Sequence, residues 1–293
     1  MALYLSESDV EGLVTPADAV DAIEACFERM ARGEIENRPR YRLATLAVMA
    51  AADVGLGVAG CKTYAGANAI VTLFAVDPPE ALAVIEANAL GRLRTGAASG
   101  VAAKYLARAG ATSLGIIGCG RQAEGQVAGI RAALPAIADV VAYCRTERSL
   151  AAFCEKVGAQ PAERARDAAE QEVVVTVTTS PDPVLRGDWL RPGALVCAVG
   201  ANDGTSRELD NHVLERASFV CCDSIEDARL ESADFVEPIE SGVLDWLEVH
   251  ELHEVVAGGV PGRAGDEDIV VFKSNGLAAW DVAVGALAVE RAV

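Results

Sequence analysis

The clearest chemical signature in the sequence is a glycine-rich segment. Residues 118–123 read Gly-Cys-Gly-Arg-Gln-Ala, a G-x-G-x-x-A pattern that follows the strand-like run SLGII and precedes a helix-prone segment. In such a pattern the first glycine permits a tight turn, the second lets the backbone approach a pyrophosphate, and the small third residue allows close helix–strand packing. The N-terminus of the following helix offers amide donors to the phosphates. The residues that this pattern assigns to a dinucleotide are Gly118, Gly120, Arg121, Gln122 and Ala123.

The end of the next strand-like run decides between the two nicotinamide dinucleotides. Enzymes that use NAD usually place an Asp or Glu there for the ribose hydroxyls. This run reads VVAYCRTE and presents Cys144, Arg145 and Thr146 at the expected place. An arginine can pair with the additional 2′-phosphate of NADP. We therefore expect Arg145 and Thr146 to contact the cofactor and NADP(H) to be favoured, with NAD(H) as the alternative.

The order of elements around these residues predicts an α/β fold. From Ser113 the sequence alternates strand-like runs with helix-prone segments, in the order SLGIIG, 122–134, VVAYC, 147–157, EVVVTVTT, ALVCAVG and SFVCCD. Repeated strand–helix alternation is typical of a parallel sheet covered by helices on both faces. We predict a Rossmann dinucleotide-binding domain over residues 113–275, with an irregular acidic segment after Ala228, a helix near 246–257 and a last strand, IVVFK.

The N-terminal part predicts a smaller α+β domain. Thr15-Pro16 starts a helix as N-cap and first helical residue, and apolar residues recur at helical spacing up to Gly33. Short strand-like runs between Tyr41 and Glu86 predict an antiparallel or mixed sheet. Residues 95–108 predict a connecting helix, and a helix at 276–292 is expected to return to this domain. We assign residues 1–112 and 276–293 to it.

Charge and composition exclude several classes of partner. Acidic residues outnumber basic ones 43 to 25, and the formal net charge of −18 repels nucleic acids and anionic lipid surfaces. No apolar stretch is long enough for a membrane span and the N-terminus lacks signal-peptide features, so we expect a cytoplasmic protein without nucleic-acid or membrane partners. The eight cysteines contain no C-x-x-C pair and are interpreted as small buried hydrophobic residues. His250 and His253 lack a third ligand, so we expect no metal site.

Six separated motifs carry a resemblance to a known family. In chain order they read LGRLRTGAASGVAAKYLAR, IIGCGRQAEGQ, AVGANDGTSRELD, VCCDS, AGGVPGR and VFKSNGLAAWD. Over most of its length the chain closely resembles the ornithine cyclodeaminase/μ-crystallin family. The resemblance implies a homodimer with a substrate and dimerisation domain beside a Rossmann domain. It also implies reactions that include cyclodeamination, alanine dehydrogenation and ketimine reduction, so the site residues must decide among them.

The resemblance also implies residues that bind an amino-acid-like substrate. The family uses an arginine upstream of an M-P-A segment, a lysine in G-x-K and the arginine of L-R-T. Residues 49–51 read MAA and match the first landmark with Ala in place of Pro, which makes the upstream arginine Arg40 or, as alternatives, Arg42 or Arg38. The other two matches are Lys62 and Arg94. Two guanidinium groups can clamp a carboxylate while a lysine donates a proton or hydrogen bond to the reacting nitrogen.

Further cofactor contacts carry over from the resemblance. They are Thr95 near the pyrophosphate, Thr178 and Thr179 after the fourth Rossmann strand, Val199 and Gly200 beside the nicotinamide, and Lys273 and Ser274 at the end of the last strand.

One departure from the family pattern bears on the reaction. Cyclodeaminases and alanine dehydrogenases of the family place a catalytic Asp in a segment AVG-x-D, and Asn202 occupies that position here. An amide donates and accepts hydrogen bonds but cannot take up a proton at neutral pH. The neighbouring Asp203 is expected to point elsewhere, because a shift of one residue in an extended segment reverses the side-chain direction.

These residues lead to three hypotheses. The first is an NAD(P)H-dependent imine or ketimine reductase, or an amino-acid dehydrogenase in the reverse direction, with Lys62 as proton donor and Asn202 orienting the substrate nitrogen. The second is an ornithine-type cyclodeaminase with retained NAD. The third is a non-catalytic μ-crystallin-like protein that binds NADPH and a ligand.

Overall fold

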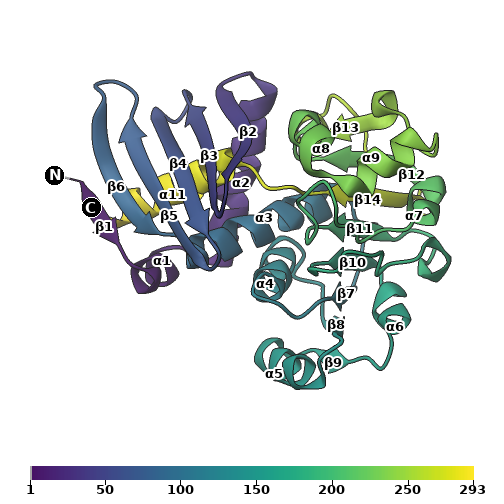
Figure 1. The fold of residues 1–293 in the computed structure, drawn as a ribbon. Coiled ribbons are helices and arrows are strands. Elements are labelled where there is room, and N and C mark those ends of the chain that lie inside the picture. The colour runs from purple at the N-terminus through teal and green to yellow at the C-terminus, as the bar shows by residue number, and fades with distance from the viewer. Residues whose placement is uncertain (1) are drawn as a thin grey trace.

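An α+β unit and an α/β unit lie side by side in the computed structural model, which describes residues 2–293 (Figure 1). The N-terminal unit consists of β1 (Leu3–Leu5), α1 (Glu7–Leu13), α2 (Pro16–Ala31), β2 (Ile35–Leu43), β3 (Leu46–Asp53), β4 (Val58–Ala65), β5 (Asn68–Ala75), β6 (Glu80–Glu86) and α3 (Asn88–Leu106), and it is completed by α11 (Ala278–Ala292). Helix α2 begins as its sequence predicts, since the Thr15 hydroxyl accepts from the amide of Asp18 and Pro16 is the first helical residue.

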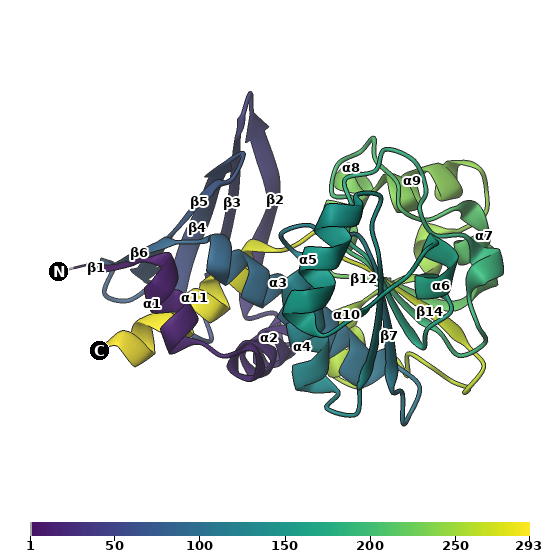
Figure 2. The same cartoon turned by 90° about the horizontal axis from the view of Figure 1, so that it is seen from below.

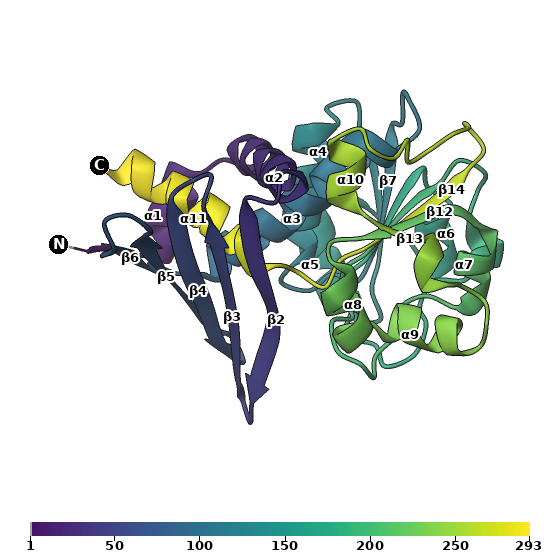
Figure 3. The same ribbon diagram turned by 90° about the horizontal axis from the view of Figure 1, so that it is seen from above.

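Helices of the described chain cover one of the two faces of this unit's sheet. Its strand order is β1-β6-β5-β4-β3-β2, antiparallel except for the β1–β6 pair. Helix α11 packs across β3 and β4, with α2 beside it, and no helix of residues 2–293 covers the opposite face (Figure 3). Large apolar side chains are exposed on β2 and β5, among them Tyr41, Leu43, Ile70 and Phe74.

The second unit has a parallel sheet in the order β13-β12-β14-β11-β10-β7-β8-β9. Its elements are β7 (Ser113–Ile117), α4 (Ala123–Ala133), β8 (Asp139–Tyr143), α5 (Glu147–Val157), β9 (Gln160–Pro161), α6 (Ala165–Ala169), β10 (Val173–Thr176), η1 (Gly187–Trp189), β11 (Leu195–Ala198), α7 (Asn211–Arg216), β12 (Ala217–Cys222), α8 (Ile225–Glu231), α9 (Ala233–Glu240), η2 (Trp246–Glu248), β13 (Val249–Glu251), α10 (Leu252–Val256) and β14 (Ile269–Lys273). Helices α4 and α5 cover one side of the sheet and α6 and α7 the other (Figure 2). This architecture confirms the predicted α/β class with a Rossmann-type domain.

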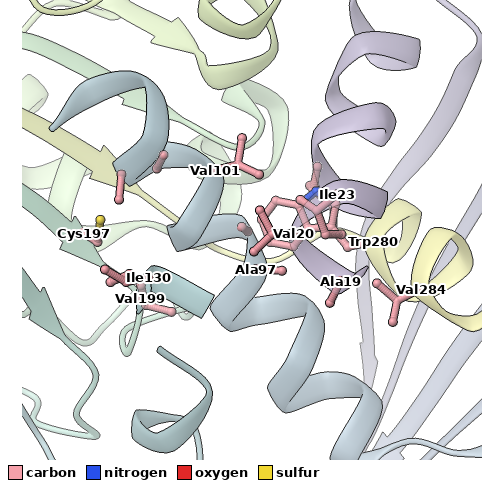
Figure 4. Packing of buried hydrophobic residues seen from close by; sticks show 14 of the residues in the cluster. Ala19, Val20, Ile23, Ala97, Val101, Ile130, Cys197, Val199, Trp280 and Val284 are labelled. Carbon is pink, nitrogen blue, oxygen red and sulfur yellow. The ribbon is translucent and has the colours of Figure 1, made fainter. Parts of the chain in front are cut away.

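Helices α3 and α4 join the two units through close glycine contacts. A Cβ atom on Gly96 would lie 1.8 Å from the carbonyl oxygen of Gly125, and one on Gly129 would lie 2.1 Å from that of Gly96. The backbones of the two helices therefore touch without intervening side chains. Apolar residues of α2, α3 and α11, including Ile23, Ala97 and Trp280, pack around this crossing (Figure 4).

The structure corrects several predicted elements. The acidic segment after Ala228 is not irregular: it contains the end of α8 and all of α9. The predicted helix near 246–257 is a 3₁₀ turn, the short strand β13 and the short helix α10, so His250 lies on a strand and stacks on Phe219. Every helix within residues 2–293 is too short or too polar to cross a lipid bilayer.

Candidate functional site

A cavity of about 320 Å³ lies between the two units and collects most of the predicted site residues. The predicted residues that line it are Arg40, Lys62, Arg94, Thr95, Gly120, Arg121, Gln122, Thr178, Thr179, Val199, Gly200, Asn202 and Ser274. Five predicted residues do not line it: Gly118, Ala123, Arg145, Thr146 and Lys273. Further lining residues that sequence reasoning missed include Met49, Tyr64, Ala69, Asn88, Arg92 and Asn275.

The glycine loop forms one wall of this cavity. Gly118 has a φ of 109°, and a Cβ there would lie 2.6 Å from the carbonyl oxygen of Val177, so only glycine fits the turn. A Cβ on Gly120 would meet no atom within 4 Å, which leaves open space beside the loop. Buried Ala123 starts helix α4. The loop therefore fits a pyrophosphate: Gly118 and Ala123 shape it, and residues 120–122 line the cavity.

Two loops after β10 and β11 form the neighbouring wall, and buried Glu208 ties them together. Its carboxylate accepts hydrogen bonds from the amides of Thr178 and Gly200, each at 2.6 Å, and from the Thr176 hydroxyl at 3.0 Å. Burial raises the pKa of Glu208, and the nearby Lys273 charge opposes that shift. Glu208 thus fixes the loops that carry Thr178, Thr179, Val199 and Gly200, a role that its sequence context did not reveal.

Lys273 supports the same wall from behind. Its side chain is fully buried, its Nζ lies 3.2 Å from Oδ2 of Asp234, and it donates a hydrogen bond to the carbonyl of Ala201. The sequence predicted Lys273 as a cofactor contact. Its ammonium is instead bonded to groups of the protein itself. It holds the loop that carries Asn202.

The loop after β14 is pinned by a second buried carboxylate. Oδ2 of Asp223 accepts from the Ser274 hydroxyl at 3.0 Å and from the amides of Asn275 and Gly276 at 2.8 and 2.6 Å. Burial raises the pKa of Asp223, while these hydrogen bonds oppose the rise. Across the cavity, the Thr95 hydroxyl donates to the carbonyl of Gly91 at 2.7 Å within helix α3. Ser274 and Thr95 thus enter the cavity lining from opposite units.

Arg145 and Thr146 lie outside the cavity at the end of β8. Tyr143 pairs with Ile117 in the sheet and its carbonyl accepts from the amide of Gly118, which places residues 144–146 beside the glycine loop. Both Arg145 and Thr146 are exposed, and Arg145 forms no ion pair within residues 2–293. Their position suits contact with the ribose end of a dinucleotide bound along this loop.

At the other end of the cavity, Lys62 of β4 and Arg94 of α3 share one buried carboxylate. Oδ1 of Asp281, on helix α11, lies 3.0 Å from Nζ of Lys62 and 3.2 Å from Nε of Arg94. Burial and the neighbouring Arg94 charge lower the pKa of Lys62 to about 8, against the opposing effect of Asp281. The lysine is therefore poised to exchange a proton near neutral pH, as an acid–base group requires.

The three candidate arginines of β2 have different surroundings. Arg38 is exposed and pairs with Glu36, and Arg42 is half-exposed with Nη2 3.0 Å from the carbonyl oxygen of Asn202. Arg40 alone lines the cavity. Its terminal nitrogens are already bonded to Glu231 and to the carbonyls of Asn275 and Asn202, and its buried Nε has no partner within residues 2–293. Arg40 is thus an interdomain contact, because three of its five N–H donors are bonded to groups of the protein.

The side chains of Asn202 and its neighbour Asp203 have different surroundings. Asn202 lines the cavity. Asp203 turns into its own loop, where Oδ1 accepts from the amide and hydroxyl of Thr205 and from the amide of Ser206 at 2.6–2.9 Å. Burial raises the pKa of Asp203, but these hydrogen bonds outweigh burial and lower it. Asp203 is therefore a turn-stabilising carboxylate and does not line the cavity.

The charge of the lining is entirely positive. Five arginine or lysine residues and no aspartate or glutamate line this cavity within the described chain. The cationic residues are Arg40, Lys62, Arg92, Arg94 and Arg121. Carboxylates outside the lining pair with four of them: Glu231 with Arg40, Asp281 with Lys62 and Arg94, and Glu11 with Arg92. The charged side chains of the lining itself are nevertheless all positive, in a protein of net charge −18. Such a lining selects anionic ligands, including phosphates and carboxylates.

Comparisons with known proteins agree with this geometry. A sequence model of the ornithine cyclodeaminase/mu-crystallin family matches residues 2–293. The alanine dehydrogenase of Archaeoglobus fulgidus is 35% identical over 314 residues, which cover 99% of this chain and 95% of that protein. The structure of Thermococcus litoralis Δ1-pyrroline-2-carboxylate reductase in complex with NADH and L-proline has a TM-score of 0.93 at 30% identity, covering 99% of this chain and 97% of that one.

An archaeal alanine dehydrogenase dimer with bound NAD has a TM-score of 0.91 at 33% identity and covers 99% of this chain and 96% of its own. The match of the family model extends over both units and includes every motif on which the resemblance was based. The predicted family is confirmed, and the chain belongs to the ornithine cyclodeaminase/mu-crystallin family.

Proposed function

We propose that this protein is an NAD(P)H-dependent oxidoreductase that reduces the C=N bond of a small α-imino acid, or oxidises the corresponding amino acid in reverse. The observation that carries the proposal is the buried Lys62–Arg94 pair, which lies in one cavity with the glycine loop. Relatives with the same fold are named as reductases and dehydrogenases of such substrates. A bound nicotinamide cofactor would supply or accept the hydride.

Each lining residue has a distinct task in this proposal. The guanidinium of Arg94 holds the substrate carboxylate, and Arg40 adds positive charge at the cavity wall. Lys62 donates a proton to the substrate nitrogen during reduction and accepts it during oxidation. The Asn202 amide orients that nitrogen. Glu208 and Asp223 keep the loops on the cofactor side in place.

Cyclodeamination of ornithine is disfavoured by the same lining. A diamino acid brings a second ammonium group, and the cavity has no carboxylate in its described lining to receive it. Asn202 also lacks the proton affinity of an aspartate. The absence of acidic groups therefore favours substrates whose side chain carries no positive charge.

We further propose that the cofactor is NADP(H) in preference to NAD(H). Exposed Arg145 stands beside the glycine loop where an acid would serve the ribose hydroxyls of NAD. Two relatives have been solved with NADH or NAD, so the ratio of kcat/KM values for NADPH and NADH decides the question. Arg145→Asp should shift that ratio towards NADH by about one to two powers of ten. A wild-type preference for NADH would refute this preference.

A homodimer and a cytoplasmic location complete the proposal. The helix-free face of the N-terminal sheet exposes apolar side chains on β2 and β5, which suits a second copy of the chain. All eight cysteines are free, as suits a reducing compartment.

The function is tested by a substrate screen. Purified protein is assayed with NADPH or NADH against cyclic imino acids and against mixtures of ammonia or amines with 2-oxo acids, and with oxidised cofactor against amino acids. We expect reductive turnover of at least one small imino acid and no ammonia release from ornithine or lysine without added cofactor. Vigorous ornithine cyclodeamination would refute the proposal, and cofactor binding without turnover on any imine would indicate a non-catalytic binding protein.

A further inference from the structure

Asp281 is buried at the point where three elements meet. It belongs to the first turn of α11, its exposed fraction is 1%, and its Oδ1 contacts both Lys62 of β4 and Arg94 of α3. Its second oxygen, Oδ2, is buried and has no hydrogen-bond partner within residues 2–293. An unpartnered buried carboxylate oxygen costs stability, so a structural role alone gives a poor account of this aspartate.

We propose that Asp281 is the positioning residue that sets the protonation of Lys62 and holds it beside Arg94. This inference rests on the proposed function, because it assigns Asp281 to the proton-transfer step of that reaction. A bound nicotinamide cofactor would supply the hydride for the new C–H bond at the imine carbon. The nitrogen takes a proton from the Lys62 ammonium, which leaves an amine, an oxidised cofactor and a neutral lysine that solvent reprotonates.

The surrounding charges explain why this control is needed. The charged groups that face the Lys62 ammonium are Arg94 from α3, Arg40 from β2 and Asp281 from α11. The adjacent strands contribute Met49 and Val71, which do not titrate. Two cations and burial thus favour neutral lysine, and Asp281 is the one group among these that favours the ammonium. Without this carboxylate, Lys62 would lose its proton at a lower pH.

The test uses the small number of lysines in the chain. Selective ¹³C labelling at the ε-carbon of lysine gives four signals, from Lys62, Lys104, Lys156 and Lys273, and the spectrum of Lys62→Met identifies the first. The titration midpoint of Lys62 is then measured by NMR in wild type and in Asp281→Asn. We expect the midpoint to fall by one pH unit or more, which is about tenfold less ammonium at a fixed alkaline pH.

Two further variants serve as a substitute and as a control. If Asp281→Asn folds poorly, Asp281→Ser takes its place. Asp281→Ser removes the same charge with a smaller side chain and should lower the Lys62 midpoint by the same amount. Asp18→Asn removes a carboxylate that pairs with Arg291 at the far end of α11 and should leave the Lys62 midpoint unchanged. An unchanged midpoint in folded Asp281→Asn or Asp281→Ser overturns the inference.

The pH dependence of activity gives an independent test, because the direction of its shift is predicted. In Asp281→Asn the alkaline limb of imine reduction should move to lower pH, and so should the acid limb of amino-acid oxidation, because both report the same lysine. A structural loss would lower both rates without moving either limb. The NMR shift can be observed even if every imine fails as a substrate, so failure of the proposed function and failure of this inference are distinguishable.

Discussion

Lys62 and Arg94 line the same cavity from β4 and α3 and share the carboxylate of Asp281. The family resemblance in the sequence points to both cations. Asp281 was missed although it ends the last motif, because its role depends on α11 returning to a strand 219 residues earlier in the chain. Lys273 shows the converse, since its motif suggested a cofactor contact but its ammonium pairs with Asp234. Such long-range pairing of charges is not encoded in local sequence patterns.

Replacement of Lys62 should separate chemistry from cofactor binding. We expect Lys62→Met to lower kcat/KM for imine reduction by a factor of about 100 or more, because a charged hydrogen bond to a buried ligand contributes roughly 2–3 kcal/mol. Cofactor affinity, measured by fluorescence titration, should change little. Lys104→Met is the matched control, because Lys104 pairs with Glu24 on the surface. Full activity in Lys62→Met would remove this lysine from the mechanism.

At the scale of elements, helix α8 connects the site to the packing of the two units. It was not predicted, because the segment after Ala228 is acidic, its helices are short and Pro238 interrupts the pattern. In the structure α8 presents Asp227 and Glu231 to β2, where Glu231 pairs with Arg40. Elements with a clear apolar periodicity, such as α2 and the strands of the parallel sheet, agree with their predictions, whereas these short acidic helices carry too few turns to show one.

Asp227 should make stability depend on pH in a definite direction. Burial, with the charges of Asp223 and Glu231, raises its pKa to about 7. The pKa of this carboxyl is about 4 in the unfolded chain and about 7 in the folded protein. The folded protein therefore favours the protonated acid, and the free energy of unfolding falls as the pH rises from about 4 through about 7. Asp227→Asn should therefore be more stable than wild type at pH 8 and similar at pH 4.

The expected gain for Asp227→Asn is at most about 4 kcal/mol, from three pKa units at 1.36 kcal/mol each. It is measured as thermal unfolding midpoints across this pH range. Glu163→Gln, which changes an exposed carboxylate, controls for the loss of one negative charge. A stability difference for Asp227→Asn that does not grow with pH would contradict the assigned direction.

The α3–α4 crossing should tolerate no added side-chain atom. In Gly129→Ala the new methyl group would lie 2.1 Å from the carbonyl oxygen of Gly96, so the helices must separate at a cost of about 1–3 kcal/mol. The unfolding midpoint should fall by several degrees, and cofactor affinity should weaken because α4 begins at the glycine loop. Gly12→Ala in helix α1 meets no atom within 4 Å and should stabilise the helix slightly. Equal midpoints for the two variants would show that the crossing is more plastic than the structure indicates.

At the scale of the whole molecule, the uncovered sheet face predicts the assembly. A dimer has twice the chain mass of 30.4 kDa, about 61 kDa, and should be observed by sedimentation or light scattering. Ile70→Glu combined with Phe74→Glu places charges on the exposed face of β5 and should yield monomers. Leu247→Glu, at an equally apolar but isolated position that is 90% exposed, should leave the dimer intact. A monomeric wild type would refute the proposed homodimer.

The contrast between the cationic cavity and the acidic exterior governs how ligands arrive. An anion that approaches a chain of net charge −18 first meets long-range repulsion, and the five cations of the lining act only at close range. Salt screens exposed charges far more than buried ones. Added salt should therefore raise the association rates of anionic substrate and cofactor and leave their dissociation rates nearly unchanged. This enzyme would then gain affinity with ionic strength up to the point where the buried contacts are themselves screened.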